Sequence, residues 1–432
     1  MSESLKIGKY RWTICGLIFF ATTINYLDRQ VIGILKPLLE SDLNIGEAEY
    51  GYIVTSFQLA YAFGMVVAGR LIDKFGTKIG YGVSVLLWSF AAMGHAFAKG
   101  GLGFGFWRAL LGISESGNFP AAIKTVAEWF PKRERALATG IFNSGTNIGA
   151  VVAPVAVPAI ATAWGWQSAF ILTGAMGFLW LIFWFIFYEI PEKQRRLSKA
   201  EMEIIKSDID EVQENPKPIS WIKLLKYRQT WIFFIGKAMT DPIWWFYLFW
   251  IPGWLSSVRG AGFNIKSFGL PLVVIYSSTT IGSIFGGWLS SFMIRKGISP
   301  FNARKYTMLI FAFLVTPVFF AQSQEISTWS AIGLISLAAS SHQAWSANIF
   351  TTVSDAFPKQ AVSSVVGIGG MAGALGGAFV SIFAGQLLEF YKKAGHIETG
   401  YTVMFTIAAC AYLLAWIIMN VFAPKNKIIV ID

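Results

Sequence analysis

The chain has 432 residues, of which 55% are hydrophobic and only 14% are charged, and its formal net charge is +11. Because about a quarter of the residues of a soluble domain are charged, this composition excludes an ordinary soluble protein and indicates a membrane protein. Its two cysteines, Cys15 and Cys410, both lie in apolar stretches and form neither a disulfide framework nor a metal set. No metal or cofactor is expected.

Runs of about 17 to 25 apolar residues are long enough to cross the hydrocarbon core as helices. The chain contains twelve such runs, and the longest break between them, 190 to 228, is charged and amphipathic. The predicted fold is therefore an all-α membrane protein with six-helix bundles at 1–190 and 229–432, joined by a linker at 191–228. The predicted spans are 12–35, 50–71, 80–99, 102–127, 137–161, 168–189, 229–256, 268–294, 306–323, 328–353, 362–388 and 400–422.

Lysine and arginine are distributed unequally between the two sets of predicted loops. With the N-terminus inside, 25 of the 35 lie on the inner side and six on the outer side. Since cytoplasmic loops carry the excess of basic residues, both termini are predicted to be cytoplasmic. This topology explains the net charge without a nucleic-acid partner. The absence of an N-x-[ST] sequon favours a multi-pass protein of a bacterial inner membrane.

The first span contains "NYLDR", residues 25–29, with two adjacent charges. A charge inside a span is costly unless it is paired or faces a cavity, so each is a functional candidate. Adjacent side chains on a helix diverge by about 100°. We therefore expect Asp28 to meet Arg108 of the fourth span, and Arg29 to face a central cavity.

The loop after the second span reads "GRLIDKFGTK", residues 69–78. It is typical of a tight turn in which Asp73 caps a helix or pairs with basic neighbours. The stretch resembles the signature of the major facilitator superfamily. The candidate gating residues are Gly69, Asp73, Lys74, Gly76 and Lys78.

The fourth span contains "FWRALLGISESGNFP", residues 106–120. Seven helical residues separate Arg108 from Glu115, so the two lie on one face, roughly 10 Å apart along the axis. With Asp28 nearby, one carboxylate pairs with the arginine and the other can carry a proton. We interpret Asp28, Glu115 and Arg108 as a coupled proton site. The alternative, a buried network that only fixes helix packing, stays open.

A repeat relates the two halves. The stretch "EWFPKRERALATGIFNSGTNIGA" at 128 aligns with "DAFPKQAVSSVVGIGGMAGALGG" at 355 with a constant offset of 227. Both stretches lie between the fourth and fifth spans of their half. Duplicated halves with a site between them are typical of alternating-access carriers.

The seventh span reads "GKAMTDPIWWFYLFWIPGWL". Lys237 and Asp241 are four residues apart and can neutralise each other, while Pro242 and Pro252 are expected to break the helix. The aromatic residues that follow suit either core packing or the apolar face of a sugar ring. They are Trp244, Trp245, Tyr247, Phe249 and Trp250.

Polar residues in other spans complete the candidate site. His342 of the tenth span is the position that the 227 offset pairs with Glu115. It is either a satisfied core histidine or a participant. With Arg29 and Lys237 from opposite halves, the cavity suits a small anion with hydroxyl groups. The neutral candidates are Gln343, Trp345, Gln58, Tyr61, Asn143 and Asn147.

Residues 108–155, with "NYLDRQVIG" and the seventh span, resemble the anion:cation symporter family and, within it, hexuronate transporters. The resemblance implies uptake of galacturonate or glucuronate with protons, with Asp28 and Glu115 coupling protons and Arg29 and Tyr61 contacting the substrate. The eleventh span, "GIGGMAGALGG", lacks the polar residues that related carriers have there, which leaves the preferred epimer open.

Other transport functions and two functions outside transport are alternatives to hexuronate uptake. Exchange of a phosphorylated or other organic anion is the main alternative, and an aldonate is an alternative substrate. A membrane sensor or enzyme is disfavoured, because the chain has neither a large soluble domain nor a catalytic constellation. The expected partners are a sugar acid, protons and the lipid bilayer, and the expected state is a monomer.

Overall fold

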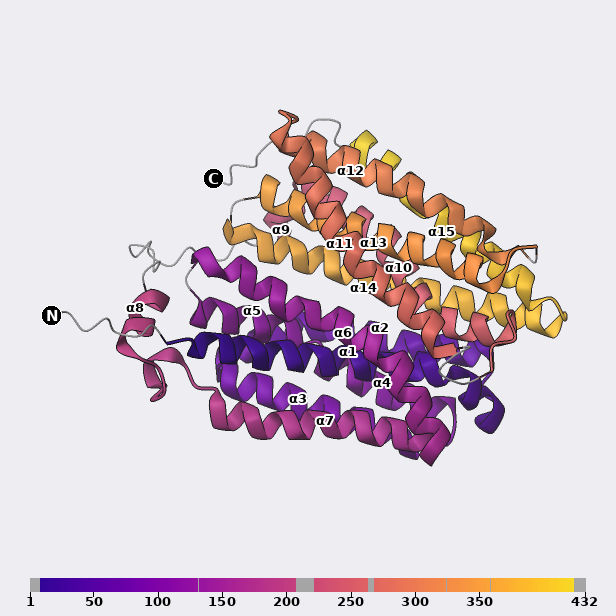
Figure 1. Ribbon diagram of the computed structural model, residues 1–432, viewed down its shortest axis with the longest axis horizontal. Helices are drawn as coiled ribbons and strands as arrows, with labels where there is room; N and C mark the ends of the chain where they lie inside the picture. The colour runs from indigo at the N-terminus through magenta and orange to yellow at the C-terminus, as the bar shows by residue number, and fades with distance from the viewer. Residues whose placement is uncertain are drawn as a thin grey trace.

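The computed structural model describes residues 8–130, 132–206, 221–262, 268–323, 325–357 and 359–422. These residues form helices and connecting turns and contain no β-strand. Figure 1 shows the long helices side by side, with the indigo-to-magenta helices in one group and the orange-to-yellow helices in another. We call these groups the N-terminal half (α1–α7) and the C-terminal half (α10–α15).

The N-terminal half contains seven helices, because the predicted fourth span is divided in two at Ser116 and Gly117. Their bounds are α1 Tyr10–Leu43, α2 Glu47–Phe75, α3 Thr77–Gly94, α4 Gly101–Glu115, α5 Asn118–Trp129, α6 Lys132–Trp164 and α7 Trp166–Phe187, with a 3₁₀ turn at His95–Phe97 after α3.

The C-terminal half contains six helices, and the second half of its third span tightens into 3₁₀ geometry. Their bounds are α10 Arg228–Ser257, α11 Leu270–Arg295, α12 Pro300–Val315 followed by η4 Thr316–Gln322, α13 Thr328–Ala356, α14 Lys359–Lys393 and α15 Ile397–Phe422. Each of the twelve predicted spans therefore coincides with a helix or a pair of consecutive helices.

By length and apolar composition alone, seven of the described helices can cross a membrane. The predicted spans outside that set belong to α1, α2, α4 with α5, α10 and α13. All of them contain buried polar or charged side chains, which lower the apolar content. The helices outside that set are thus the ones that hold the charged residues of the candidate site.

The repeat is visible in local structure. In the first copy Phe130 follows α5 in extended conformation and its N–H donates to the Val126 carbonyl at 3.0 Å. In the second copy Phe357 follows α13 in the same way, with its N–H 2.9 Å from the Val353 carbonyl. A new long helix, α6 or α14, starts directly afterwards. The prolines of both copies lie outside the described residues.

The linker between the halves is attached to the start of α1. Its helix α8, Lys199–Lys206, carries Glu201, which is fully buried. The Glu201 carboxylate accepts hydrogen bonds from the backbone N–H groups of Tyr10 and Arg11, each at 3.0 Å, and pairs with the Arg11 guanidinium. Unsatisfied N–H groups at a helix start favour such an acceptor. The remaining linker elements are η2 Pro191–Lys193 and α9 Trp221–Leu224.

The predicted helix breaks at Pro242 and Pro252 are wrong, since α10 continues through both. Each proline leaves the carbonyl four residues earlier without its helical N–H partner. The freed Ala238 carbonyl lies against Gly376 of α14, and the freed Leu248 carbonyl lies against Gly33 of α1. Glycine lets a neighbouring backbone approach these carbonyls, as is common between membrane helices.

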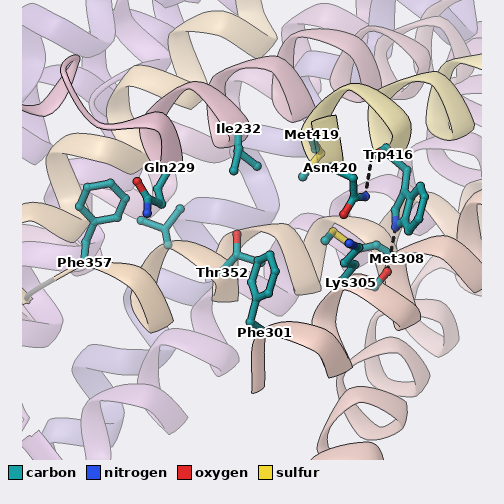
Figure 2. A pocket seen from close by; sticks show the side chains of 11 residues that line it. Gln229, Ile232, Phe301, Lys305, Met308, Thr352, Phe357, Trp416, Met419 and Asn420 are labelled. Atoms are coloured by element: carbon teal, nitrogen blue, oxygen red, sulfur yellow. Dashed lines mark hydrogen bonds between the residues drawn. The ribbon is translucent and has the colours of Figure 1, made fainter. Parts of the chain in front are cut away.

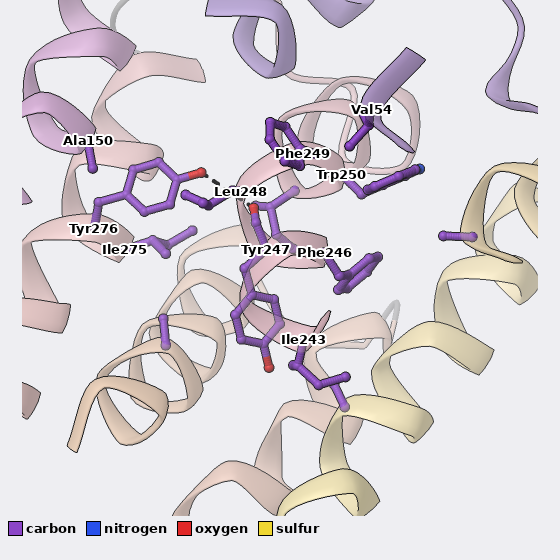
Figure 3. Close-up of a cluster of buried hydrophobic side chains, with 14 of the residues drawn as sticks. Val54, Ala150, Ile243, Phe246, Tyr247, Leu248, Phe249, Trp250, Ile275 and Tyr276 are labelled. Atoms are coloured by element: carbon purple, nitrogen blue, oxygen red, sulfur yellow. Dashed lines mark hydrogen bonds between the residues drawn. The ribbon is translucent and has the colours of Figure 1, made fainter. Parts of the chain in front are cut away.

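The hydrophobic core crosses from one half to the other. Figure 3 shows the α10 segment Ile243–Trp250 packed with Val54 of α2 and Ala150 of α6 from the N-terminal half. Tyr247, Phe249 and Trp250 are fully buried there. These three residues therefore belong to the core and not to a sugar-binding surface. Trp244 and Trp245 are only half-buried.

The two halves meet at the end of the molecule away from the start of α1 (Figure 1). We call this contact, between residues 47–55 of α2 and 378–389 of α14, the closed end. Thr55 donates to the Ala378 carbonyl at 3.2 Å, and Glu389 accepts from the Glu47 N–H at 2.9 Å. Near the other end, a Cβ added at Gly69 of α2 or Gly367 of α14 meets nothing within 4 Å. At these two positions, unlike at the closed end, an added Cβ touches no atom of the other half.

Candidate functional site

The central ion pair joins α1 to the last residue of α4. Nη2 of Arg29 lies 2.8 Å from Oε2 of Glu115, and Nε lies 3.0 Å from the same oxygen. Both side chains are almost completely buried. The Asn25 side-chain oxygen accepts a further hydrogen bond from Arg29 at 3.3 Å. The expected pair between Asp28 and Arg108 is wrong, because it is Arg29 that lies between the charges of α4.

Aromatic rings from both halves enclose the Arg29 guanidinium. Its central carbon lies 4.7 to 5.0 Å from the ring centroids of Tyr26, Phe57 and Tyr61, and 5.7 Å from that of Trp245 on α10. Cations over aromatic faces are stabilised when water is excluded. Arg29 thus contacts side chains of both halves and is almost completely buried, and its facing a central cavity stays a prediction.

Arg108 also lies near the Phe57 ring, 4.6 Å from its centroid. One of its amino groups donates to the Arg29 carbonyl at 3.5 Å, while Nε and Nη1 have no hydrogen-bond partner. Neither oxygen of Asp28 accepts a hydrogen bond of good distance and angle from the described chain. Its polar neighbour is the Thr173 hydroxyl of α7. Buried polar atoms without partners are rare and point to a functional site.

The C-terminal half contributes a second ion pair, which confirms the i, i+4 prediction. Nζ of Lys237 lies 2.7 Å from Oδ2 of Asp241. Lys237 also lies 4.3 Å from the centroid of the Phe350 ring. The carboxylate is the more exposed partner, with 18% of its side chain accessible against 7% for the lysine.

His342 is a buried member of a hydrogen-bond chain. Its Nδ1 lies 2.6 Å from the Tyr412 hydroxyl, which lies 3.4 Å from the Thr240 carbonyl. The Tyr412 hydroxyl has one proton. In one tautomer it donates this proton to the Thr240 carbonyl and accepts from Nδ1–H, which leaves Nε2 of His342 as an acceptor. In the other it donates to Nδ1, and Nε2 carries the hydrogen. The ring stacks on Trp244, with centroids 5.2 Å apart.

The other predicted substrate residues are less closely connected. Trp345 is fully buried against Tyr412, and its Nε1 has no hydrogen-bond partner. Gln343 and Asn147 are half-buried, and Asn143 is exposed. Their positions neither support nor exclude contact with a substrate, and these assignments remain predictions.

The predicted gating turn is built around Gly76, whose φ of +81° favours glycine. Lys78 pairs with Glu189, after the end of α7, at 2.8 Å. That hydrogen bond from Lys78 lowers the pKa of Glu189. Lys74 is exposed, and the Asp73 side chain is outside the described part of the structure. The gating role remains a prediction.

Several residues of the site were not predicted. Tyr26 and Phe57 enclose Arg29, Tyr412 orients His342, and Gly373 leaves room for Asp241. Tyr26 lies inside "NYLDR", so its proximity to Arg29 was available from the sequence. The others lie on helices whose mutual rotation the sequence does not reveal.

Two pockets lie away from these residues. Figure 2 shows one near the start of α10, lined among others by Gln229, Lys305 and Trp416. Its volume of about 20 Å³ is near that of one water-sized probe and too small for a sugar. A groove of about 800 Å³ at the closed end is lined among others by Glu49 and Glu389. Neither contains a predicted substrate residue.

Two halves of membrane helices related by a repeat, each with a buried ion pair of its own, are typical of a secondary transporter and not of an enzyme. Residues 18–381 match the Major Facilitator Superfamily. The chain is 31% identical to the hexuronate transporter of Escherichia coli K12, covering 98% of this chain and 96% of that protein. It is 34% identical to the galacturonate transporter of Dickeya chrysanthemi, covering 66% and 82%. The protein belongs to the major facilitator superfamily.

Solved structures agree with this fold. A bacterial homolog of the human lysosomal transporter Spinster, in an inward-facing conformation, superimposes with a TM-score of 0.76 at 17% identity and 96% coverage of both chains. A D-xylose–proton symporter gives 0.75 at 17% identity, covering 98% of this chain and 100% of that one. At these identities the likeness concerns the fold.

Proposed function

We propose that the protein imports hexuronates such as galacturonate and glucuronate together with protons. The observation that carries this proposal is the Arg29–Glu115 pair, enclosed by aromatic rings from both halves. The similarity to hexuronate and galacturonate transporters supports the substrate class.

Substrate transport is coupled to protons because Glu115 and the substrate carboxylate compete for the guanidinium of Arg29. While Glu115 is ionised it occupies Arg29, and this guanidinium is not available to a substrate carboxylate. A proton on Glu115 removes its charge and frees Arg29 for the substrate, because a buried guanidinium is costly without a counter-ion. Asp28, whose oxygens accept no hydrogen bond of good distance and angle, is the second proton-binding group. Substrate and proton then cross together.

The remaining polar groups bind the sugar hydroxyls in this proposal. The Tyr61 ring lies beside Arg29, and His342 offers Nε2 from the other half. Aromatic rings suit the apolar face of a pyranose. Trp245 lies between the two ion pairs and provides such a face.

Transport itself is a rocking of the two halves, 1–190 and 229–432, with residues 191–228 as linker. The closed end opens as the other end closes. With both termini cytoplasmic, as the distribution of basic residues favours, the closed end faces the outside of a bacterial inner membrane. A single chain supplies both halves, so we propose a monomer.

The test is uptake of radiolabelled galacturonate and glucuronate by proteoliposomes, with and without an inward proton gradient. Wild type is expected to accumulate substrate only with the gradient. Glu115→Gln, which mimics a permanently protonated group, is expected to keep exchange of labelled for unlabelled substrate but to lose accumulation. Glu398→Gln, which removes an exposed carboxylate, serves as the control. Uptake indifferent to both gradient and mutation would instead favour an organic-anion or organophosphate antiporter.

A second candidate substrate class is the aldonates, since the D-galactonate transporter of Escherichia coli O6:H1 is 27% identical over 95% of this chain. Aldonates have the same carboxylate but an open polyol chain. Competition of labelled galacturonate uptake by unlabelled galactonate separates the two classes.

A further inference from the structure

We infer that Asp241 is a selectivity residue: by neutralising Lys237, it restricts the site to sugar acids with a single carboxylate. The inference rests on the proposed function and adds to it the reason why a diacid is rejected. It depends on the position of the second ion pair, which the coupling mechanism does not use.

Lys237 is the buried cation of the C-terminal half among the residues that the structure describes. Its ammonium group contacts Asp241 on one side and the Phe350 ring on another. With Asp241 ionised, the pair carries no net charge. A second carboxylate therefore finds no free cation in this half.

The two ion pairs, one in each half, share neighbouring residues at the boundary between the halves. Asp241 lies one helical turn before Trp245, whose ring contacts Arg29. Tyr26 lies against Arg29 and within electrostatic reach of both Glu115 and Asp241. A ligand whose carboxylate binds Arg29 thus directs its other end toward Asp241.

The two ends of a six-carbon sugar acid differ in their chemistry. In galacturonate the far end is a hydroxyl that can donate to Asp241. In galactarate, the corresponding diacid, it is a carboxylate, which Asp241 repels.

The position of Asp241 is fixed by α14. A Cβ added at Gly373 would overlap Oδ2 of Asp241. The glycine leaves a slot that the carboxylate fills. This contact also gives a role to the glycine-rich eleventh span, which has no polar side chain of its own for the substrate.

The test is a gain of function. Uptake of labelled galacturonate and galactarate is measured in proteoliposomes for wild type, Asp241→Asn, and the double variant Lys237→Gln/Asp241→Asn, with Glu398→Gln as a control for charge removal at an exposed site. Asp241→Asn frees Lys237 and is expected to raise galactarate uptake relative to galacturonate by about tenfold or more, the effect of one charge-assisted hydrogen bond. The double variant is expected to lose this gain, because the freed cation is gone.

The unfolding temperature of the protein in detergent provides a second measurement, since a bound ligand raises it. Galactarate is expected to stabilise Asp241→Asn more than wild type. If wild type carries galacturonate but Asp241→Asn neither takes up galactarate nor is stabilised by it, the inference fails and the proposed function stands. Galactarate uptake by wild type, or a gain that persists in the double variant, also overturns it. If wild type neither carries galacturonate nor is stabilised by it, the proposed function and the selectivity role of Asp241 both fail.

Discussion

Gly51 of α2 packs directly against Gly385 of α14. A Cβ added to Gly51 would lie 3.1 Å from the Gly385 Cα and 2.6 Å from the Ser381 carbonyl oxygen. Around this contact Lys392 pairs with Glu40, and Tyr50 donates to the Phe249 carbonyl at 3.0 Å. Glycine allows the two backbones to meet, and the polar contacts hold them there.

Replacing Gly385 by valine is expected to prevent the closed end from forming. Overpacking of this kind costs about 1 to 3 kcal/mol, which shifts the balance between conformations roughly tenfold toward the one that is open at this end. Spin labels on the facing ends of α2 and α14, in a background without the two native cysteines, measure the separation. Gly367→Val, at a position with open space, is the control. An unchanged distance in Gly385→Val would contradict the role of this contact.

Tyr412 is expected to control which nitrogen of His342 carries the proton. Tyr412→Phe removes the hydrogen-bond partner of Nδ1, so the tautomer of His342, and with it the role of Nε2 toward a substrate hydroxyl, is no longer fixed by the tyrosine. We expect the ratio of galacturonate to glucuronate uptake to change several-fold, with little effect on proton coupling. Tyr401→Phe is the control, since Tyr401 is also a buried tyrosine of α15 that donates to a carbonyl, that of Trp250. An equal change in both variants would indicate loss of packing instead.

The sequence reveals where charges are buried but not which charges meet. Hydrophobic runs locate the spans, and the cost of a buried charge singles out Asp28, Arg29, Arg108 and Glu115. Pairing depends on how α1 is rotated between α4 and α7. Asp28 turns toward Thr173 of α7, which leaves the adjacent Arg29 to face Glu115. No periodicity within α1 alone contains this information.

Contacts between helices also explain why α10 stays continuous. Its prolines correctly indicate freed carbonyls, and the sequence predicts a break from them. Gly376 and Gly33 lie against these carbonyls from two other helices. These contacts to the freed carbonyls depend on the tertiary structure, because the glycines are more than a hundred residues away from the carbonyls along the chain.

The pair of Lys78 and Glu189 predicts a pH-dependent stability. The pKa of Glu189 is lowered in the folded state by the hydrogen bond from Lys78, so the stabilisation is present above the unfolded pKa of about 4.3 and is lost as the pH falls through the folded pKa. Because both side chains are about a third exposed, the effect is below about 1 kcal/mol. The unfolding temperature of Glu189→Gln is expected to be lower than that of wild type at pH 7, with a difference that shrinks at pH 4. A difference that grows on acidification would contradict this sign.

Gly373→Ala tests whether the slot in α14 holds Asp241 in place. The added methyl group would overlap Oδ2 of Asp241, which must move away from Lys237. Leaving a buried lysine without its partner costs about 3 to 5 kcal/mol if the pair separates completely, so we expect a lower unfolding temperature and reduced uptake. Gly370→Ala, one turn earlier on the same helix, is the matched control, because a Cβ there meets its first neighbour, Met65, at 4.0 Å. If both variants retain wild-type stability and uptake, Asp241 does not depend on this glycine. If Gly373→Ala loses uptake while its unfolding temperature is unchanged, the position of the carboxylate matters to transport itself.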